Sequence, residues 1–303
     1  MKFGLSLPHF RHIASPDAIR RVAQRAEALG YDGIWVSDHI VVPHSAVARF
    51  GGVFYEPLTV LGFAAACTSQ IRLGTTVIIV PYRNPLVTAK VLATLDVLSG
   101  GRIIAGMGVG STEDEFKALG VPFRERGALS DEYLAAFKIL WTQPNPAFHG
   151  QHVRFEEIAF EPKPIQKPHI PLWIGGNSRR AIRRAAAFGD CWHPTRPLVE
   201  DVKAGIAYLK DVCGQRGRDP KSLTVAVRQP LKFYDGAEAS VKRRPLLGSP
   251  QKIIDDLGQY QEAGVGYAML DTFYSVPELE QETVDSLLAT IERFATDVMP
   301  KFP

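Results

Sequence analysis

Short apolar runs alternate with amphipathic stretches along the whole chain. The first pair shows the pattern: residues 3–7 form an apolar run, and apolar residues then recur at helical spacing up to Leu29. Ser15 and Pro16 offer an N-cap followed by proline at the first helical position, and Gly30 supplies a stop. These signals predict a buried strand followed by a surface helix.

The same pattern repeats eight times. The predicted strands are residues 3–7, 33–36, 72–80, 102–106, 172–174, 191–193, 223–231 and 267–270. The predicted helices are residues 16–29, 58–68, 85–98, about 113–141, 179–188, 200–213, 250–263 and 278–295. Strict alternation of strands and helices requires parallel strands. A count of eight favours a closed (β/α)8 TIM barrel, an α/β fold, over an open doubly wound sheet.

Residues 142–171 interrupt this rhythm. The segment is rich in proline and glycine and holds only one short apolar piece, residues 153–160. Structureless loops of this length are uncommon unless they are functional, so we interpret it as an insertion between strands four and five. The rest of the chain has no Gly/Ser linker and no repeat. We therefore expect one barrel domain over residues 1–303.

Composition narrows the class of protein without changing this picture. The chain has 303 residues, 46% hydrophobic and 22% charged, as is usual for a soluble globular enzyme. The formal net charge of +3 gives no field that would favour nucleic acid or anionic membranes as partners. No apolar stretch approaches the roughly 18 residues of a membrane span, and the first residues do not resemble a signal peptide.

The three cysteines, Cys67, Cys191 and Cys213, are far apart and form no C-x-x-C motif. They support neither a disulfide framework nor a zinc site. No H-x-H or similar cluster indicates a metal-dependent barrel hydrolase, so we expect no metal. Together with the missing leader, this predicts a cytoplasmic protein.

Active sites of such barrels lie at the carboxyl ends of the strands. Asp38 and His39 follow strand two and are the most reactive pair there. Histidine titrates near neutral pH, and a neighbouring carboxylate can fix its tautomer. The alternative is an aspartate that turns the loop beside a half-buried histidine.

Two glycine-rich turns also follow strands. Gly175, Gly176, Asn177 and Ser178 open a helix, where backbone N–H groups and the helix dipole favour a phosphate. The alternative is an ordinary turn with a serine N-cap. The other turn, residues 106–110, has glycine at alternate positions but Ser111 where a dinucleotide fingerprint needs glycine. We interpret its glycines as clearing space for a flat ligand.

A series of motifs runs in fixed order through almost the whole chain. They are Ala23-x-x-Ala26-Glu27-x-Leu29-Gly30-Tyr31-Asp32, Trp35-Val36-Ser37-Asp38-His39, Arg72-Leu73-Gly74-Thr75-Thr76-Val77, Arg83-Asn84-Pro85, Leu95-Asp96-x-Leu98-Ser99-Gly100-Gly101-Arg102, Gly106-x-Gly108-x-Gly110, Glu115-Phe116-x-x-Leu119-Gly120 and Ile174-Gly175-Gly176-x-Ser178. Together they resemble the bacterial luciferase-like superfamily of flavin- and deazaflavin-dependent oxidoreductases. The Asp-His pair with Leu-Ser-Gly-Gly-Arg is most similar to the branch that uses the deazaflavin coenzyme F420.

The resemblance implies a TIM barrel with an insertion and a set of site residues. A non-prolyl cis peptide is expected between Thr76 and Val77, beneath the tricyclic ring of the cofactor. The residues expected to bind the cofactor are Asp38, Thr76, Val77, Ile79, Val109, Gly110, Gly175, Gly176, Asn177 and Ser178, the last four at its phosphate. Asp38 and His39 are expected to face the reactive edge of the ring.

Three functions follow from the resemblance. The first is F420-dependent hydride transfer to or from a small organic substrate, with His39 as the proton-transfer group and Asp38 orienting it. The second is an FMN-dependent monooxygenase that uses reduced flavin and O2, with a separate reductase supplying the reduced cofactor. The third is a non-catalytic flavin-binding relative. A homodimer is expected from the resemblance.

Three features depart from the family pattern. The sugar-phosphate dehydrogenase branch has an aromatic residue a few positions past Asp-His, where this chain has residues 41–44, VVPH. Ser111 stands where the sugar-phosphate dehydrogenase branch has glutamate, so glucose 6-phosphate is not the expected substrate. Cys191 stands where relatives commonly have glycine, and nothing in the sequence explains it.

Overall fold

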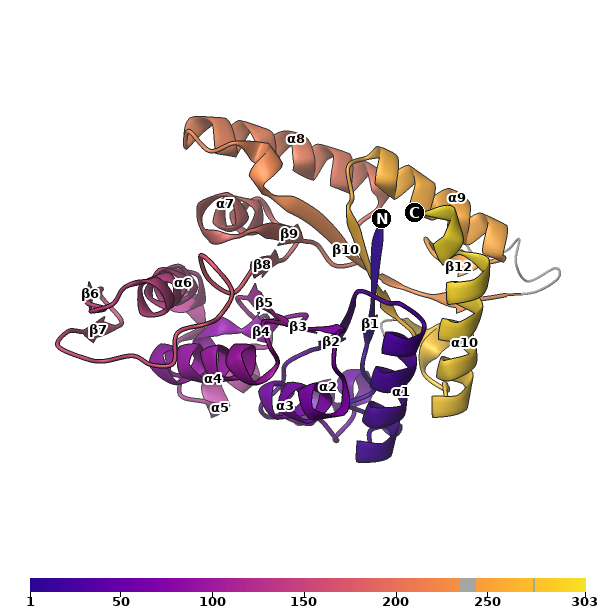
Figure 1. Cartoon of the computed structure of the whole chain (residues 1–303), viewed down its shortest axis with the longest axis horizontal. Coiled ribbons are helices and arrows are strands. Elements are labelled where there is room, and N and C mark those ends of the chain that lie inside the picture. The colour runs from indigo at the N-terminus through magenta and orange to yellow at the C-terminus, as the bar shows by residue number, and fades with distance from the viewer. Residues whose placement is uncertain (235–243, 275) are drawn as a thin grey trace. The chain divides into compact units, whose positions relative to one another are not determined.

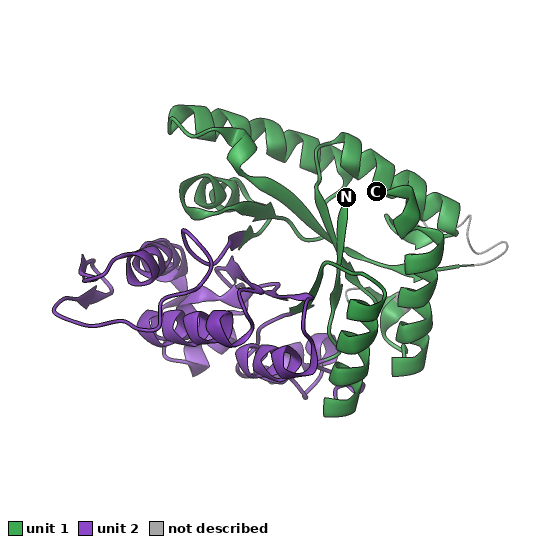
Figure 2. Cartoon of the chain, viewed as in Figure 1, with its two compact units in different colours: residues 1–8, 15–35, 174–303 green, residues 9–14, 36–173 purple. Residues whose placement is uncertain are grey.

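The computed structural model describes residues 1–234, 244–274 and 276–303 (Figure 1). These residues group into two compact units, each built from separate stretches of the chain (Figure 2). Unit 1 comprises residues 1–8, 15–35 and 174–303, and unit 2 comprises residues 9–14 and 36–173. The single domain expected from the sequence stays a prediction.

The main sheet is a closed barrel of eight parallel strands. Its strand order is β3-β2-β1-β13-β10-β9-β8-β5, and pairing of β3 with β5 closes the ring. The strands are β1 (Lys2–Ser6), β2 (Gly33–Val36), β3 (Arg72–Thr75), β5 (Ile103–Gly108), β8 (Leu172–Gly175), β9 (Cys191–His193), β10 (Thr224–Pro230) and β13 (Tyr267–Asp271). The (β/α)8 TIM barrel predicted from the alternation of strands and helices is confirmed.

Unit 1 carries five long helices within its described residues. They are α1 (Pro16–Ala28), α7 (Arg179–Phe188), α8 (Val199–Gln215), α9 (Pro250–Glu262) and α10 (Val284–Asp297). Two short strands, β11 (Lys232–Phe233) and β12 (Leu247–Gly248), pair with each other. The last helix begins six residues later than predicted, because Pro277–Leu279 form a separate 3-10 turn and Thr283 caps α10. No helix within the described residues is both long and apolar enough to cross a membrane.

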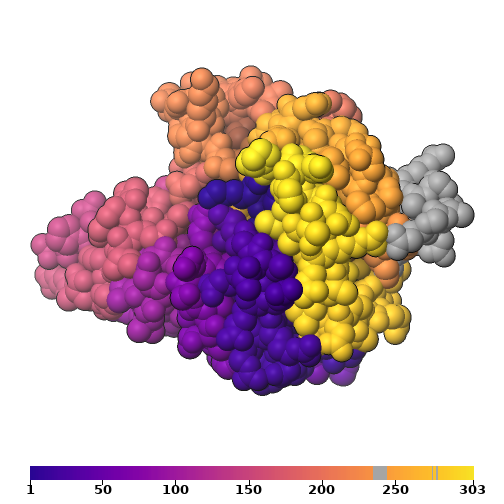
Figure 3. All heavy atoms as spheres, turned by 45° about the vertical axis from the view of Figure 1, so that its right-hand side comes forward, coloured from indigo at the N-terminus to yellow at the C-terminus, as the bar shows by residue number. Residues whose placement is uncertain are grey.

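Helices from the two ends of the sequence lie side by side in unit 1, as Figure 3 shows for α1 in indigo and α10 in yellow. Arg21 and Arg25 of α1 form ion pairs with Asp285 and Glu292 of α10 at 2.8 and 2.7 Å. Because all four side chains are at least 45% exposed, these pairs add little stability. The buried apolar faces of the helices hold them in place instead.

Unit 2 differs from the predicted elements in three places. Its helices are α2 (His44–Phe50), α3 (Pro57–Cys67), α4 (Pro85–Leu98), α5 (Glu113–Ala118) and α6 (Arg126–Thr142). Helix α2 was not predicted, because it buries no residue and so leaves no apolar stripe. The helical zone 113–141 is two helices, since Gly120 adopts a positive φ of 69° after α5 and Pro122 follows. The strand predicted at 72–80 divides into β3 and β4 (Ile78–Ile79).

The predicted insertion contains a short antiparallel ribbon, β6 (Phe148–His149) with β7 (Arg154–Phe155). One carboxylate on α6 holds the turn of this ribbon. Glu132 accepts hydrogen bonds from the backbone N–H groups of Gln151, His152 and Val153 at 3.0, 2.7 and 2.6 Å. The segment is therefore ordered by a contact that the sequence pattern did not reveal.

The Leu-Ser-Gly-Gly-Arg motif has a structural role in unit 2. Arg102 is buried, and its guanidinium donates to the carbonyl oxygens of Ala65, Thr68 and Ile71 at 3.0, 3.2 and 3.1 Å. Its Nε donates to the carbonyl of Ser99 at 2.7 Å. A single side chain thus satisfies carbonyl groups at the carboxyl ends of α3 and α4, which would otherwise lack partners.

Polar side chains occupy the barrel interior of unit 1 near the carboxyl ends of its strands. Arg228 of β10 and Asp271 of β13 form a buried ion pair, with Nε–Oδ2 at 2.8 Å. Ser6 of β1 donates to the same carboxylate at 2.5 Å. His193 of β9 is buried beside them, and its Nδ1 lies 2.9 Å from the carbonyl oxygen of Ala226.

The buried His193 predicts a pH dependence of stability. Burial lowers the pKa of His193 to about 4, from an ordinary value of 6.5. The unfolded chain therefore binds more protons than the folded one between these values, and stability falls as the pH drops from about 6.5 to about 4. We expect a loss of about 3 kcal/mol in the free energy of unfolding over this range.

Urea unfolding of the wild type and of His193→Gln at pH 7 and pH 4 measures this effect. The variant is expected to lose most of the His193 contribution to the pH dependence. His149→Gln, whose imidazole is half exposed, serves as the control and should keep the wild-type dependence. Equal pH dependence in all three proteins would contradict the prediction.

Candidate functional site

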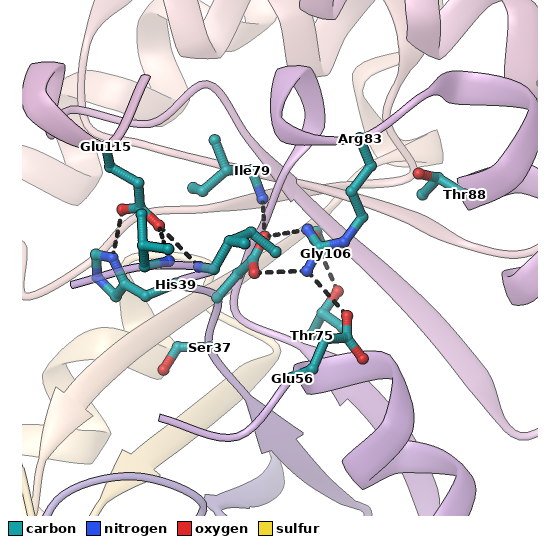
Figure 4. A network of polar contacts seen from close by, with 12 residues as sticks. Ser37, His39, Glu56, Thr75, Ile79, Arg83, Thr88, Gly106 and Glu115 are labelled. Atoms are coloured by element: carbon teal, nitrogen blue, oxygen red, sulfur yellow. Dashed lines mark hydrogen bonds and ion pairs between the residues drawn. The ribbon is translucent and has the colours of Figure 1, made fainter. Parts of the chain in front are cut away.

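In unit 2, Asp38 lies two residues after the end of β2 and is tied into an ion-pair network with Arg83, whose side chain Figure 4 labels together with Glu56 and Ile79. Arg83 binds its carboxylate through both terminal nitrogens, with Nη1–Oδ2 at 2.7 Å and Nη2–Oδ1 at 2.9 Å. The backbone N–H of Ile79 donates to Oδ2 at 2.8 Å, and Arg83 also donates to Glu56 at 2.9 Å. Both oxygens of Asp38 therefore have protein partners.

Burial dominates the electrostatics of this network. The side chain of Asp38 has no exposed surface, and burial raises the pKa of Asp38 above its ordinary value. The hydrogen bonds and charge of Arg83 and the N–H of Ile79 oppose this shift. Burial alone would lower the pKa of Arg83, but Asp38 and Glu56 raise it overall. A fully buried carboxylate is thus kept in place by a guanidinium that stays charged.

His39 is oriented by Glu115 and not by Asp38 (Figure 4). Its Nδ1 lies 2.7 Å from Oε2 of Glu115, which has no exposed surface. The other carboxylate oxygen accepts from the backbone N–H groups of Ile40 and Val41 at 2.7 and 3.3 Å. The hypothesis that Asp38 orients His39 is therefore wrong, because the Asp38 carboxylate is committed to Arg83.

The contact with Glu115 determines which nitrogen of His39 can react. With Nδ1–H donated to the carboxylate, the neutral imidazole presents Nε2 as an acceptor. No residue in the described ranges is hydrogen-bonded to Nε2, and the imidazole remains 13% exposed. The arrangement of carboxylate, imidazole and open nitrogen can accept or donate one proton at a defined atom.

Glu115 and Arg83 both stand in the family motifs, but the sequence alone assigns neither of them to the site. Their partners are 76 and 45 residues away along the chain, so no local spacing reveals the contacts. Glu115 is one of three successive acidic residues, Glu113, Asp114 and Glu115, so its acidic character alone does not single it out, and the only sequence signal is its place in the family motif beside Phe116. Glu115 and Phe116 are both buried at the start of α5.

The expected cis peptide between Thr76 and Val77 is present. It lies where β3 ends and β4 begins, and the N–H of Thr76 donates to the carbonyl of Val36 at 2.7 Å. Val77 and Ile79 are each partly exposed, as are Val109 and Gly110 after β5. A Cβ on Gly110 would lie 2.8 Å from Ile79, so these two predicted cofactor residues are brought together.

We expected the glycines of residues 106–110 to leave empty space above the barrel. Two of them, Gly106 and Gly108 of β5, do not. A Cβ on Gly106 would lie 1.7 Å from the carbonyl oxygen of Thr75, and one on Gly108 would lie 2.3 Å from the side chain of Val77. The neighbouring strand segment fills the space that these glycines provide. Their interpretation as a clearing for a flat ligand was wrong at these two positions, because close strand packing requires them.

The predicted phosphate turn lies in unit 1, between β8 and α7. Gly176 adopts a positive φ of 121°, and its carbonyl accepts from the indole N–H of Trp192 at 2.9 Å. Asn177 exchanges two hydrogen bonds of 2.9 Å with the backbone of Thr195. The hydroxyl of Ser178 accepts from the N–H of Ala181, so it serves as the N-cap of α7.

The backbone of this turn keeps donors available for an anion. The N–H groups of Ser178, Arg179 and Arg180 make no hydrogen bond within the described part of the chain. The turn borders a cavity of about 350 Å³ whose walls include Asn177, Arg179 and Tyr208. These donors at a helix N-terminus fit a phosphate group, whereas the side chains of Asn177 and Ser178 are already occupied.

Comparison with known proteins identifies the family. The model of the luciferase-like monooxygenase family matches residues 1–243. The chain belongs to this family. The luciferase-like barrel is also seen in a monooxygenase from Streptomyces bottropensis, RslO1, whose crystal structure matches all of both chains with a TM-score of 0.85 and 23% identity.

Two further known proteins, one similar in sequence and one similar in fold, differ in their cofactors. Over 208 residues the chain is 31% identical to the FMNH2-dependent dimethylsulfone monooxygenase of Pseudomonas putida, covering 68% of this chain and 56% of that enzyme. An F420-dependent secondary alcohol dehydrogenase has the same fold, with a TM-score of 0.80, 19% identity and coverage of 100% of this chain and 99% of that one. The chain is thus an oxidoreductase of the luciferase-like family, in which members use FMN or F420.

Proposed function

We propose that this luciferase-like protein is an F420-dependent oxidoreductase that transfers a hydride to or from a small organic substrate. The observation that carries the proposal is the imidazole of His39, held at Nδ1 by Glu115 and open at Nε2. A fixed proton-transfer group after a barrel strand is what interconversion of a hydroxyl and a carbonyl needs besides a hydride carrier. Bound F420 supplies the site that accepts or donates the hydride.

The residues that would hold the cofactor are distributed over two turns and one strand segment. Val77, Ile79, Val109 and Gly110 offer a partly exposed, apolar surface for a tricyclic ring. The backbone N–H groups that begin α7 offer donors for its phosphate. The carboxylate of Asp38 orients the N–H of Ile79, and thereby the strand segment beneath the ring, rather than the substrate.

The protein then contributes proton transfer. For oxidation, Nε2 of His39 accepts the proton of a substrate hydroxyl as the hydride leaves its carbon. The buried carboxylate of Glu115 stabilises the imidazolium that results. For reduction of a carbonyl the same proton returns from Nε2 to the oxygen.

A second candidate, an FMN-dependent monooxygenase, is supported by the similarity to the dimethylsulfone enzyme. The main support for F420 is the resemblance of the Asp38-His39 pair to the F420 branch. The Leu-Ser-Gly-Gly-Arg motif adds little to that choice, because Arg102 serves the helix ends. The non-catalytic relative is the third hypothesis. The homodimer, the separate reductase and the cytoplasmic location stay predictions.

Titration of the purified protein with F420 and, separately, with FMN tests the proposal through ring fluorescence. We expect F420 to bind at least about tenfold more tightly than FMN, a difference of roughly 1.4 kcal/mol. Binding of FMN alone, together with O2 uptake that depends on an added substrate, would replace the proposal with the monooxygenase. Binding of neither cofactor would overturn both.

A further inference from the structure

Two aromatic rings enclose the imidazole of His39. The ring of Phe50, at the end of α2, has its centroid 4.2 Å from that of the imidazole at an interplanar angle of 42°. Phe54 meets the imidazole edge to face at 5.1 Å. The atom proposed to transfer a proton therefore belongs to a ring with apolar neighbours on two sides, in addition to the buried Glu115.

The segment that carries these rings exposes more apolar surface. Ile40, Val41, Val47 and Val53 are 38%, 42%, 37% and 48% exposed, and α2 buries no residue. All four lie within the 14 residues that follow His39 in the sequence. Exposed apolar side chains concentrated beside a reactive group indicate a binding surface rather than chance exposure.

The two aromatic walls are held differently. Phe54 stacks on Phe10 with centroids 4.7 Å apart, and the N–H of Arg11 donates to the carbonyl of Val53 at 2.9 Å. Helix α2, in contrast, is attached through Ser45 to Asp114 at 3.2 Å and through Arg11 to the carbonyl of Arg49 at 3.4 Å. Phe54 is thus fixed by ring stacking and by a backbone hydrogen bond beside it, whereas Phe50 belongs to a helix that buries no residue.

We propose that Phe50 and Phe54 bind the hydrocarbon part of the substrate while its oxygen is hydrogen-bonded to Nε2 of His39. The substrate class is then an apolar ketone or secondary alcohol, and Phe50 determines how long a chain is accepted. This inference rests on the proposed role of His39. Each methylene group placed against the rings is expected to tighten binding by about three- to fourfold.

Protection of His39 from diethyl pyrocarbonate tests the proposal on the protein without added cofactor. The reagent acylates an open imidazole nitrogen, and peptide mass spectrometry reports each histidine separately. We expect 2-butanone, 2-hexanone and 2-octanone to slow modification of His39 at progressively lower concentrations, by about 10- to 16-fold for each two-carbon step. His149, half exposed on β6, is the internal control and should react equally throughout.

Matched variants separate Phe50 from the exposed apolar surface in general. Phe50→Ala is expected to reduce the gain per methylene to less than about twofold, and Phe50→Leu should restore most of it. Val87→Ala, on α4 and 59% exposed, should behave as the wild type. Protection that does not depend on chain length, or equal protection by hexanoate and 2-hexanone, would overturn the proposal.

The experiment is independent of the cofactor titration. Protection of His39 by long ketones in a protein that binds neither F420 nor FMN would leave the apolar site standing and remove the proposed reaction. Binding of F420 without any protection by ketones would keep the reaction and overturn the substrate class. Each result therefore decides one of the two proposals, the F420-dependent reaction or the apolar substrate, and leaves the other unaffected.

Discussion

Replacement of His39 by glutamine is expected to slow turnover by about 10²- to 10⁴-fold, the usual contribution of a general acid or base. Glutamine can still form a hydrogen bond to the substrate oxygen, but it cannot take up or release a proton at neutral pH. The affinity for the cofactor should stay within about twofold of the wild type, because the change removes only a step of the reaction. Steady-state kinetics and the fluorescence titration measure the two quantities separately.

Glu115→Gln tests the positioning role of the carboxylate on the same enzyme. The amide has the same shape and can still accept from the N–H of Ile40, but it no longer stabilises an imidazolium. We expect kcat to fall by about tenfold or more with KM nearly unchanged, since the interaction acts mainly in the transition state.

As a control for proton transfer by His39, added imidazole should partly restore turnover to His39→Gly. Wild-type kcat in His39→Gln would refute the assignment.

Arg83→Met is expected to lower the free energy of unfolding by about 3–5 kcal/mol. The substitution leaves the carboxylate of Asp38, which has no exposed surface, with only the N–H of Ile79 as a partner. Removing one member of a buried ion pair costs more than the pair contributes, because the remaining charge stays desolvated. Urea unfolding monitored by tryptophan fluorescence measures the loss.

Two comparisons make this prediction specific. Glu56→Gln breaks only the partly exposed arm of the network and should cost less than about 1 kcal/mol. The double variant Asp38→Asn with Arg83→Met should recover part of the loss, because no buried charge is left.

The loss of stability in Arg83→Met should also depend on pH. Without Arg83 the pKa of Asp38 in the folded state rises further, so the folded protein binds a proton at Asp38 that the unfolded chain releases. The deficit in the free energy of unfolding, relative to the wild type, should therefore grow from pH 5 to pH 8. An equal deficit at both pH values would argue against the buried charge as its cause.

The fold could be predicted from the sequence because its elements follow local rules. Ser15 and Pro16 begin α1 as their capping chemistry predicts. Helix α2 could not be predicted this way, since it buries no residue and so has no stripe of apolar positions at helical spacing. The resemblance predicted the cis peptide between Thr76 and Val77, but the break between β3 and β4 was not predicted, because nothing in the local pattern of residues 72–80 distinguishes them from one strand.

The site was predicted in part. Active sites of (β/α)8 barrels lie at the carboxyl ends of the strands, and this rule singled out Asp38 and His39. Because the two residues are adjacent in the sequence, we expected Asp38 to orient His39. Neighbouring residues in an extended segment point in different directions, and here one side chain meets Arg83 while the other meets Glu115. Such partners come from distant parts of the chain. Tertiary packing decides the pairing, and single-sequence periodicity carries no information about it.

The single carboxylate of Glu132 has a consequence for variation among related chains. Because it binds three successive backbone N–H groups, it specifies the path of the β6–β7 turn without reference to the side chains of Gln151 and His152. The hydrogen bonds to Glu132 accordingly allow any residue at position 151 that keeps its backbone N–H, whereas His152 is only 16% exposed and lies beside Glu125. The backbone of the β6–β7 turn is thus held from α6, and a new exposed side chain can be introduced at position 151 without a change in the backbone path.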